Sequence, residues 1–332
     1  MLRISVLGSG SGGNSAVIFT DDTRLLIDAG LSAKQLKLRL GIVGIDPESL
    51  DGVLITHEHG DHVRGLDVFC RTVQVPLYSN AMTREVMMSG KVDRPKTWRI
   101  VPTGGRFKVG DIEVQTFPVA HDATEPMGFA LRDSESAIGV LSDVGYVTNL
   151  MRNHMQGMNT IFVEANYDVI LLQNDTKRPW STKQRILSRH GHLSNDQTAE
   201  LLGEVGSEQL HRVILGHLSQ DCNEPQMAID VMQKALKAQG HSHVVVECAR
   251  QDVPTECHSA IPGWEPEPGI VEADPESEAI VLVNEASEPE EHSSNVVRQE
   301  AARPEPEMAF AGVGTPEPEP WNAADLHQGE LF

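Results

Sequence analysis

The stretch THEHGDH at residues 56–62 carries three histidines and one aspartate within seven positions. A short β-branched run precedes it and a helical periodicity follows, so we expect these side chains on a turn between a strand and a helix. On such a turn the side chains can converge on one point above a sheet edge. Imidazoles and carboxylates suit zinc, manganese or iron, and a catalytic site keeps coordination positions open. The stretch therefore predicts a catalytic metal site rather than a histidine-rich surface turn.

The spacing favours two ions over one. If all four side chains of one short turn bound a single ion, no position would remain for a substrate. Two ions sharing the cluster need further ligands from other parts of the chain. Candidates at the ends of predicted strands are His121 in PVAHDA, Asp143 in LSDVG and His217 in ILGHLS.

Short β-branched runs bounded by turn residues predict strands along the body of the chain. These runs are 3–7, 16–20, 24–28, 52–56, 112–117, 137–142, 160–164, 211–215 and 243–247. Helical periodicity predicts helices at 61–73, 195–205 and 224–238, with Asp61 and Asn195 placed to cap two of them. This mixture predicts an α/β protein whose sheets carry helices on their outer faces, and it leaves the topology open.

The 332-residue chain has a net charge of −21. Its composition differs between the body of the chain and an acidic, proline-rich segment at the C-terminal end. Residues 259–332 hold 17 acidic and 2 basic residues and 10 of the 19 prolines. Repeats such as EPEP at 265–268 bury little apolar surface and sustain neither strands nor helices. We expect a catalytic domain at 1–258 and a disordered acidic linker at 259–327. The apolar island at 279–283 is too short to form a core.

Two further features of the sequence indicate where the protein is located and what its cysteines do. Apolar runs stay well short of the roughly 18 residues that span a membrane, and MLRISVLGSGSGG is unlike a signal peptide. A cytoplasmic protein is therefore expected. The four cysteines show no CxxC spacing, which indicates neither a disulfide frame nor a thiolate zinc site.

The ordered pattern HxHxDH…H…D…H, preceded by Asp28 in LLIDAG, resembles that of the metallo-β-lactamase-fold hydrolases. The resemblance covers about residues 1–250 and implies a four-layer αββα fold with two divalent ions, zinc or manganese. It implies His57, His59 and His121 on one ion, Asp61, His62 and His217 on the other, and Asp143 bridging them. The resemblance also implies a catalytic role for Asp61. It implies that Asp28 orients the metal ligands without binding an ion itself.

Two further stretches distinguish among the reactions of such hydrolases. GHLSND at 191–196 and VEANYD at 163–168 resemble the paired His and Glu motifs of the phosphodiesterase branch, as in the tRNA 3′-processing nucleases. The resemblance implies that His192 protonates the leaving alkoxide and that Glu164 orients His192. In the alternative reading, His192 helps to cap the helix near Asn195 and Glu164 ends a strand in solvent.

A basic run leads into His192 within an otherwise acidic protein. It comprises Lys177, Arg178, Lys183, Arg185, Arg189 and His190. Nucleic-acid backbones require such clustered cations, and Trp180 within the run could stack on a base. A solvated helix face is the ordinary alternative for charges of this kind.

The whole set of motifs looks like the bacterial YycJ/WalJ (VicX) group of metallo-β-lactamase-fold exonucleases. This resemblance implies 5′ to 3′ degradation of DNA in replication or repair. The turn GSGSGGNS at 8–15 belongs to the set. Its backbone amides could hold a substrate phosphate, or it could be only a flexible turn.

The segment QGELF at 328–332 is similar to the peptide by which bacterial replication and repair proteins bind the DNA sliding clamp. Leu331 and Phe332 would fill an apolar pocket while Gln328 makes directional hydrogen bonds. Three other functions stay open: RNA processing on the same site, hydrolysis of thioesters or other small molecules, and a clamp-tethered adaptor with a structural metal site.

Overall fold

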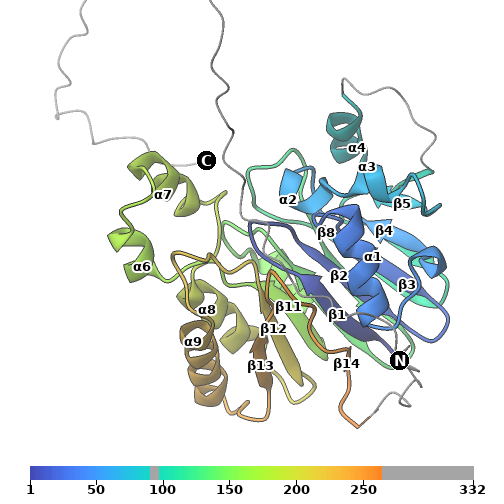
Figure 1. The fold of residues 1–332 in the computed structure, drawn as a ribbon. Helices are drawn as coiled ribbons and strands as arrows, with labels where there is room; N and C mark the ends of the chain where they lie inside the picture. The colour runs from blue at the N-terminus through green and yellow to red at the C-terminus, as the bar shows by residue number, and fades with distance from the viewer. Residues whose placement is uncertain (90–96, 264–332) are drawn as a thin grey trace, which may run out of the picture. The chain divides into compact units, whose positions relative to one another are not determined.

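The computed structural model describes residues 1–89 and 97–263. Within them two seven-stranded sheets lie face to face, with helices against both outer faces (Figure 1). The predicted apolar island at 279–283, most of the predicted linker, and Gln328, Leu331 and Phe332 lie outside the described residues.

The first sheet has the strand order β14-β1-β2-β3-β4-β5-β6. Its strands are β1 Arg3–Gly8, β2 Ser15–Phe19, β3 Arg24–Ile27, β4 Gly52–Leu54, β5 Leu77–Ser79, β6 Trp98–Ile100 and β14 His258–Ser259. Strands β1 to β3 are antiparallel, whereas β3 to β6 are parallel. The carboxyl ends of the parallel strands therefore meet at one edge.

The second sheet repeats this plan with the order β13-β12-β11-β10-β9-β8-β7. Its strands are β7 Arg106–Val109, β8 Ile112–Pro118, β9 Met127–Arg132, β10 Ala137–Leu141, β11 Thr160–Glu164, β12 Arg212–Gly216 and β13 Val245–Cys248. Strands β7 to β10 are antiparallel, and β10 to β13 are parallel.

Three apolar layers hold these sheets and helices together. Between the sheets, side chains such as Ile4, Phe129 and Ile214 are fully buried. Burial of each such side chain contributes about 1.5–3 kcal/mol to the free energy of folding. The first sheet is covered by α1 Ala33–Ile42, α3 Leu66–Phe69 and α4 Ala81–Met88. The second sheet is covered by α5 Asn149–Met155, α8 Asn195–Val205 and α9 Pro225–Ala238. The predicted αββα fold is confirmed.

The remaining short elements are η1 Pro47–Ser49, α2 Gly60–Val63, α6 Val169–Asn174 and α7 Trp180–Ile186. Figure 1 shows α6 and α7 standing out from the second sheet, beyond α8. Among the described residues, every helix is too short or too polar to cross a membrane.

All nine predicted strands form, each with ends within two residues of those expected. The predicted helix at 61–73 is wrong, because the segment forms two short helices, α2 and α3, separated by Arg64 and Gly65. A Cβ at Gly65 would lie 1.9 Å from Leu31 O, so this backbone packs directly against the chain before α1.

The predicted helix caps are also wrong. His59, not Asp61, is the N-cap of α2, and Asp61 lies in its first turn. Ser194, not Asn195, caps α8 by accepting a hydrogen bond from Gln197 N. In both places the local sequence offers several adjacent polar residues, and tertiary contacts decide which one takes the capping position.

The folded chain continues just past residue 258. In β14, His258 and Ser259 pair with β1, and the backbone N–H of Ala260 donates to Leu2 O at 2.9 Å. Ala260 is fully buried. The last strand therefore closes the free edge of the first sheet.

Candidate metal centre

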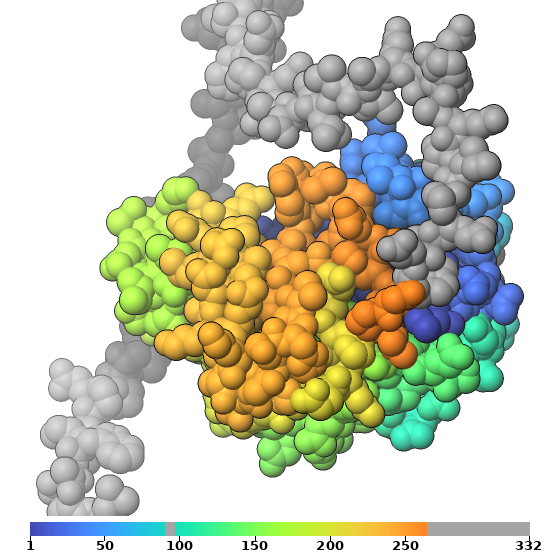
Figure 2. Space-filling model, turned by 90° about the horizontal axis from the view of Figure 1, so that it is seen from below, coloured from blue at the N-terminus to red at the C-terminus, as the bar shows by residue number. Residues whose placement is uncertain are grey.

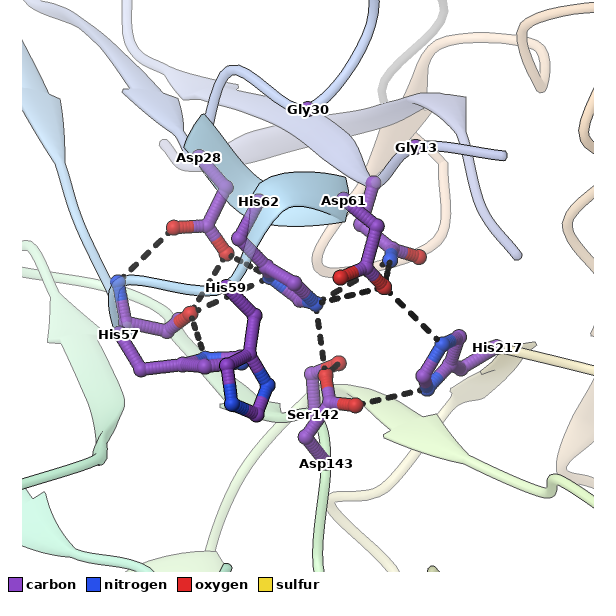
Figure 3. Close-up of polar contacts among 12 residues, drawn as sticks. Gly13, Asp28, Gly30, His57, His59, Asp61, His62, Ser142, Asp143 and His217 are labelled. Atoms are coloured by element: carbon purple, nitrogen blue, oxygen red, sulfur yellow. Dashed lines mark hydrogen bonds and ion pairs between the residues drawn. The ribbon is translucent and has the colours of Figure 1, made fainter. Parts of the chain in front are cut away.

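The predicted ligands lie together at the carboxyl ends of strands from both sheets (Figure 3). Loops after β4, β8, β10 and β12 carry them. Three overlapping groups of side chains are close enough to hold a metal ion: His57, His59 and His121; His57, His62 and Asp143; and Asp143, Glu164, His192 and His217. The αββα fold thus brings together residues that are far apart in the chain.

The group of His57, His59 and His121 fits a divalent ion, with donor atoms within 4.8 Å of one another. His57 Nε2 is buried and has no hydrogen-bond partner among the described residues, which is costly unless its lone pair is used. Burial lowers the pKa of His57 well below its usual value, so its imidazole is neutral, as a ligand must be. His121 Nδ1 donates to Gly191 O at 3.0 Å, which leaves Nε2 for an ion.

Asp143 stands between the two sets of histidines. Its Oδ2 lies 2.8 Å from His62 Nε2, and its Oδ1 lies 2.9 Å from His217 Nδ1 and 3.9 Å from His121 Nε2. Burial alone would lower the pKa of His62, but Asp143 and Asp28 raise it to about 10. The buried carboxylates therefore favour positive charge at this point, which is the electrostatic condition for binding cations.

Asp61 reaches the same group from the first turn of α2. Its Oδ2 lies 3.5 Å from His217 Nε2 and 3.6 Å from His62 Nε2. Asn14 Nδ2 donates to that oxygen at 3.3 Å, and the backbone N–H of Asn14 donates to Asp61 O at 2.7 Å. Asn14 was missed as a site residue, and its only signal was its place in GSGSGGNS.

Asp28 lies behind the candidate ligand His62. Its Oδ2 accepts from His62 Nδ1 at 2.7 Å, and its Oδ1 accepts from Thr56 N at 2.8 Å. Thr56 Oγ1 also donates to Oδ2, at 2.7 Å, and lies 2.9 Å from His57 Nδ1. These contacts hold the His62 ring so that its Nε2 points at Asp143 (Figure 3).

The Glu164–His192 pair is preformed. His192 Nδ1 lies 2.6 Å from Glu164 Oε1, and Val144 N donates to Oε2 at 2.6 Å. Glu164 is buried and does not end its strand in solvent. Because Ser194 caps α8, the alternative role of His192 as a helix cap is also excluded. Burial alone would lower the pKa of His192, but Glu164 raises it.

Three site residues have left-handed backbones, with φ of 56° at Asp28, 55° at Asp143 and 54° at His217. They are the only residues other than glycine with positive φ in the part of the chain that the structure describes. This conformation costs a non-glycine residue of order 1–3 kcal/mol and clusters at functional sites. Sequence patterns carried no signal of it.

The glycine-rich turn positions ligands rather than presenting free amides. Gly10 N donates to Asn14 Oδ1 at 2.9 Å, Gly12 N to Gln251 Oε1 at 2.7 Å, and Gly13 N to Gly10 O at 3.0 Å. These three amides are therefore already used within the chain. The turn is also not simply flexible, because Gln251 and Asn14 hold it on either side.

Three of the six basic residues of the run, Lys177, Arg178 and Arg185, are paired with acidic groups. Lys177 and Arg178 both contact Asp221, at 2.5 and 3.1 Å. Arg185 Nε lies 2.5 Å from Asp122 Oδ2. Lys183 is buried, and its ammonium donates to the backbone carbonyls of Gln173 and Asp175.

Lys183 is thus unavailable to a nucleic acid. Its ammonium instead ties α7 to the end of α6. Arg189 lies over the ring of Tyr146. Trp180 is 62% exposed and can still contact a ligand.

Residues 23–218 match the family model described as the beta-lactamase superfamily domain. The chain belongs to the metallo-β-lactamase superfamily. It is 36% identical over 240 residues to exodeoxyribonuclease YycJ of Bacillus anthracis, covering 72% of this chain and 90% of that protein. It is 37% identical over 238 residues to exodeoxyribonuclease WalJ of Streptococcus pneumoniae, covering 70% and 88% of the two chains.

Solved structures share the fold of this metallo-β-lactamase superfamily member at low identity. The metallo-β-lactamase-fold protein YhfI of Bacillus subtilis aligns with a TM-score of 0.56 at 15% identity, over 77% of this chain and 100% of that one. Unliganded yeast PDE1 aligns with a TM-score of 0.58 at 14% identity, over 76% and 98%. With its buried histidine and aspartate clusters, the chain is a metallohydrolase related to the YycJ/WalJ exodeoxyribonucleases.

Proposed function

We propose that this metallohydrolase is a phosphodiesterase that degrades DNA from the 5′ end in replication or repair. The observation that carries the proposal is the 2.6 Å contact between His192 Nδ1 and Glu164 Oε1, beside the candidate metal ligands. The similarity to two exodeoxyribonucleases supports DNA as the substrate.

Two divalent ions, zinc or manganese, would polarise the phosphoryl group and the attacking water when bound. His57, His59 and His121 would hold one ion, and Asp61, His62 and His217 the other, with Asp143 contacting both. The chain's own residues then orient these ligands: Asp28 holds His62, and Asn14 holds Asp61. The imidazole donors suit zinc, and the carboxylate donors suit manganese.

His192 supplies the proton in this proposal. Glu164 occupies its Nδ1, so Nε2 is the nitrogen left to donate. Water adds to phosphorus and loses one proton to the solvent, the bond from phosphorus to the 3′ oxygen breaks, and His192 protonates that oxygen as it leaves. The phosphate then remains on the 5′ oxygen of the shortened strand.

The test is hydrolysis of end-labelled DNA by the full chain. Single- and double-stranded DNA labelled at the 5′ or the 3′ end, and matched RNA, are incubated with Mn²⁺ or Zn²⁺, with His59→Ala as control. Mononucleotide release from 5′ ends, absent in the control, is the expected result. Preference for RNA, or cleavage of small thioesters without any nuclease activity, would overturn the DNA assignment.

For partners, we propose that the segment 328–332 docks on the replication sliding clamp through Gln328, Leu331 and Phe332. The support is the sequence pattern of a glutamine, two variable positions and then Leu-Phe. Binding of the full chain to purified clamp should be lost in the double variant Leu331→Ala, Phe332→Ala, while hydrolysis of DNA in solution is unchanged. If the full chain and the double variant bound the clamp with equal affinity, this part of the proposal would be wrong.

A further inference from the structure

A second group of metal-ligand side chains lies away from the candidate metal centre. Glu208, His241 and His243 each offer one donor atom, and these atoms lie within 4.8 Å of one another. The segment between α8 and β12 contributes Glu208, and the segment between α9 and β13 contributes both histidines. The group therefore lies where β12 and β13 begin, whereas the candidate metal centre lies where strands end.

This position is on the lower face of the molecule. Figure 1 shows α8 and α9 in the lower part of the view, below α2 of the candidate metal centre. Figure 2 views the molecule from below, and it shows yellow and orange segments packed side by side on this face.

The local backbone holds His241 in place before any ion binds. His241 N donates to Leu236 O at 2.9 Å, and Val244 N donates to His241 O at 3.2 Å. A Cβ on Gly206 would lie 2.6 Å from His241 Cδ2, so the absence of a side chain there admits the imidazole ring. The His241 ring is thus packed against the end of α8.

One ring nitrogen of His241 is an unused donor atom. His241 Nδ1 is buried and has no hydrogen-bond partner among the described residues. A buried imidazole nitrogen without a partner costs free energy unless a ligand uses it. His243 and Glu208 are exposed and can move toward a common ligand. Around tetrahedral zinc, donor atoms lie about 3.3 Å apart. A movement of these two side chains by about an ångström would bring the three donor atoms to that spacing.

The electrostatic setting favours a cation. Helices α8 and α9 both end beside the group, at Val205 and Ala238. A helix carries a partial negative charge at its carboxyl end, and Glu208 adds a full one. Lys237 is the opposing charge nearby, and it lines the same surface hollow as His241.

We propose that Glu208, His241 and His243 bind a divalent transition-metal ion of the zinc type, independently of the candidate metal centre. Two imidazoles and one carboxylate, with water in the fourth position, form a donor set that zinc accepts. The ion would join the segments that precede β12 and β13 and thereby stabilise one edge of the second sheet. A third histidine, His211, lies next to the group, with its ring centroid 6.4 Å from that of His243.

The test counts zinc ions bound per chain. Full-length protein is freed of metal, titrated with Zn²⁺ against a chromophoric chelator, and compared with His243→Ala and Glu208→Gln. Ser242→Ala is the matched control, because Ser242 lies between the two histidines and belongs to no donor group. We expect His243→Ala to bind one zinc fewer than wild type, Glu208→Gln to bind the same zinc at least about tenfold more weakly, and Ser242→Ala to match wild type.

Hydrolysis of DNA by the same proteins separates this site from the candidate metal centre. All three variants should retain wild-type turnover, because the group is at the opposite ends of the strands. Equal zinc counts in wild type and His243→Ala would overturn the proposal. Loss of a zinc together with loss of turnover in His243→Ala would also overturn it, since the group would then not be independent.

Discussion

Glu164 Oε1 and His192 Nδ1 lie 2.6 Å apart, with Asp143 Oδ1 at 3.6 Å from the same nitrogen. Glu164 ends β11, and His192 lies just before α8. The carboxylate is buried, while the imidazole is partly open to solvent. This arrangement fixes one ring nitrogen and leaves the other free, which a general acid requires.

His192→Gln should lower turnover of DNA by about 10²–10⁴-fold, because the leaving oxygen loses its proton donor. Metal content, measured by atomic emission, should remain that of wild type. Glu164→Gln should have a smaller effect on turnover than His192→Gln, since its amide oxygen can still accept from His192 Nδ1. A parallel loss of metal and turnover in His192→Gln would instead make His192 a metal ligand.

Asp28→Asn should weaken metal binding by about 10–100-fold, because His62 loses the carboxylate that orients it. Competition with a chelator gives the affinity. The control is Asp46→Asn, since Asp46 caps η1 far from the ligands and asparagine caps equally well. Unchanged affinity in Asp28→Asn would show that Thr56 alone holds the loop.

Gly30→Ala should destabilise the protein by about 3 kcal/mol and impair metal binding. The new Cβ would lie 1.7 Å from Asp61 O and 2.7 Å from Asn14 N, so the loop that carries Asp61 must move. Gly41→Ala is the control, because nothing lies within 4 Å of a Cβ there. It should raise stability by up to about 0.5 kcal/mol. Equal denaturation midpoints for the two variants would contradict this prediction.

Acid should remove the contribution of Glu247 to stability. Burial would raise the pKa of Glu247, but His258 and Arg212, at 3.0 and 2.7 Å, hold it below its usual value. A carboxylate with a lowered pKa stabilises the fold above its unfolded pKa of about 4.3, and that stability is lost as pH falls. Glu247→Gln should therefore cost about 1 kcal/mol at pH 7, and the difference from wild type should shrink below about pH 4. A difference that is constant across this range in urea denaturation would disprove the assignment.

Trp180→Ala should weaken binding of single-stranded DNA at least about fivefold, since stacking on a base contributes about 1–3 kcal/mol. Turnover at saturating DNA should not change. Leu187→Ala provides the comparison, because Leu187 is also exposed, at 40%, but cannot stack. Equal effects of the two substitutions on KM would favour a purely structural role for α7.

The strands were predictable where β-branched residues form buried runs, as in β2 and β11, because burial on both faces leaves a continuous apolar signal. Edge strands carried less signal. In β7, RFKV alternates between exposed and more buried positions over only four residues. Helix α1, AKQLKLRLGI, buries only Leu36, Arg39 and Leu40 among its ten residues, so its periodicity is weak.

The candidate ligand set was readable from sequence because HxHxDH is a local pattern and its candidate partners each follow a strand. That placement alone brings them to one edge once the sheets form. Other features depend on residues distant in the chain. The left-handed backbone of Asp143, the contact from Asn14 to Asp61 and the burial of Lys183 arise from packing between segments. Local sequence determined which groups could bind metal, and the tertiary structure decided how they are held and which cations remain exposed, because both depend on contacts that exist only after folding.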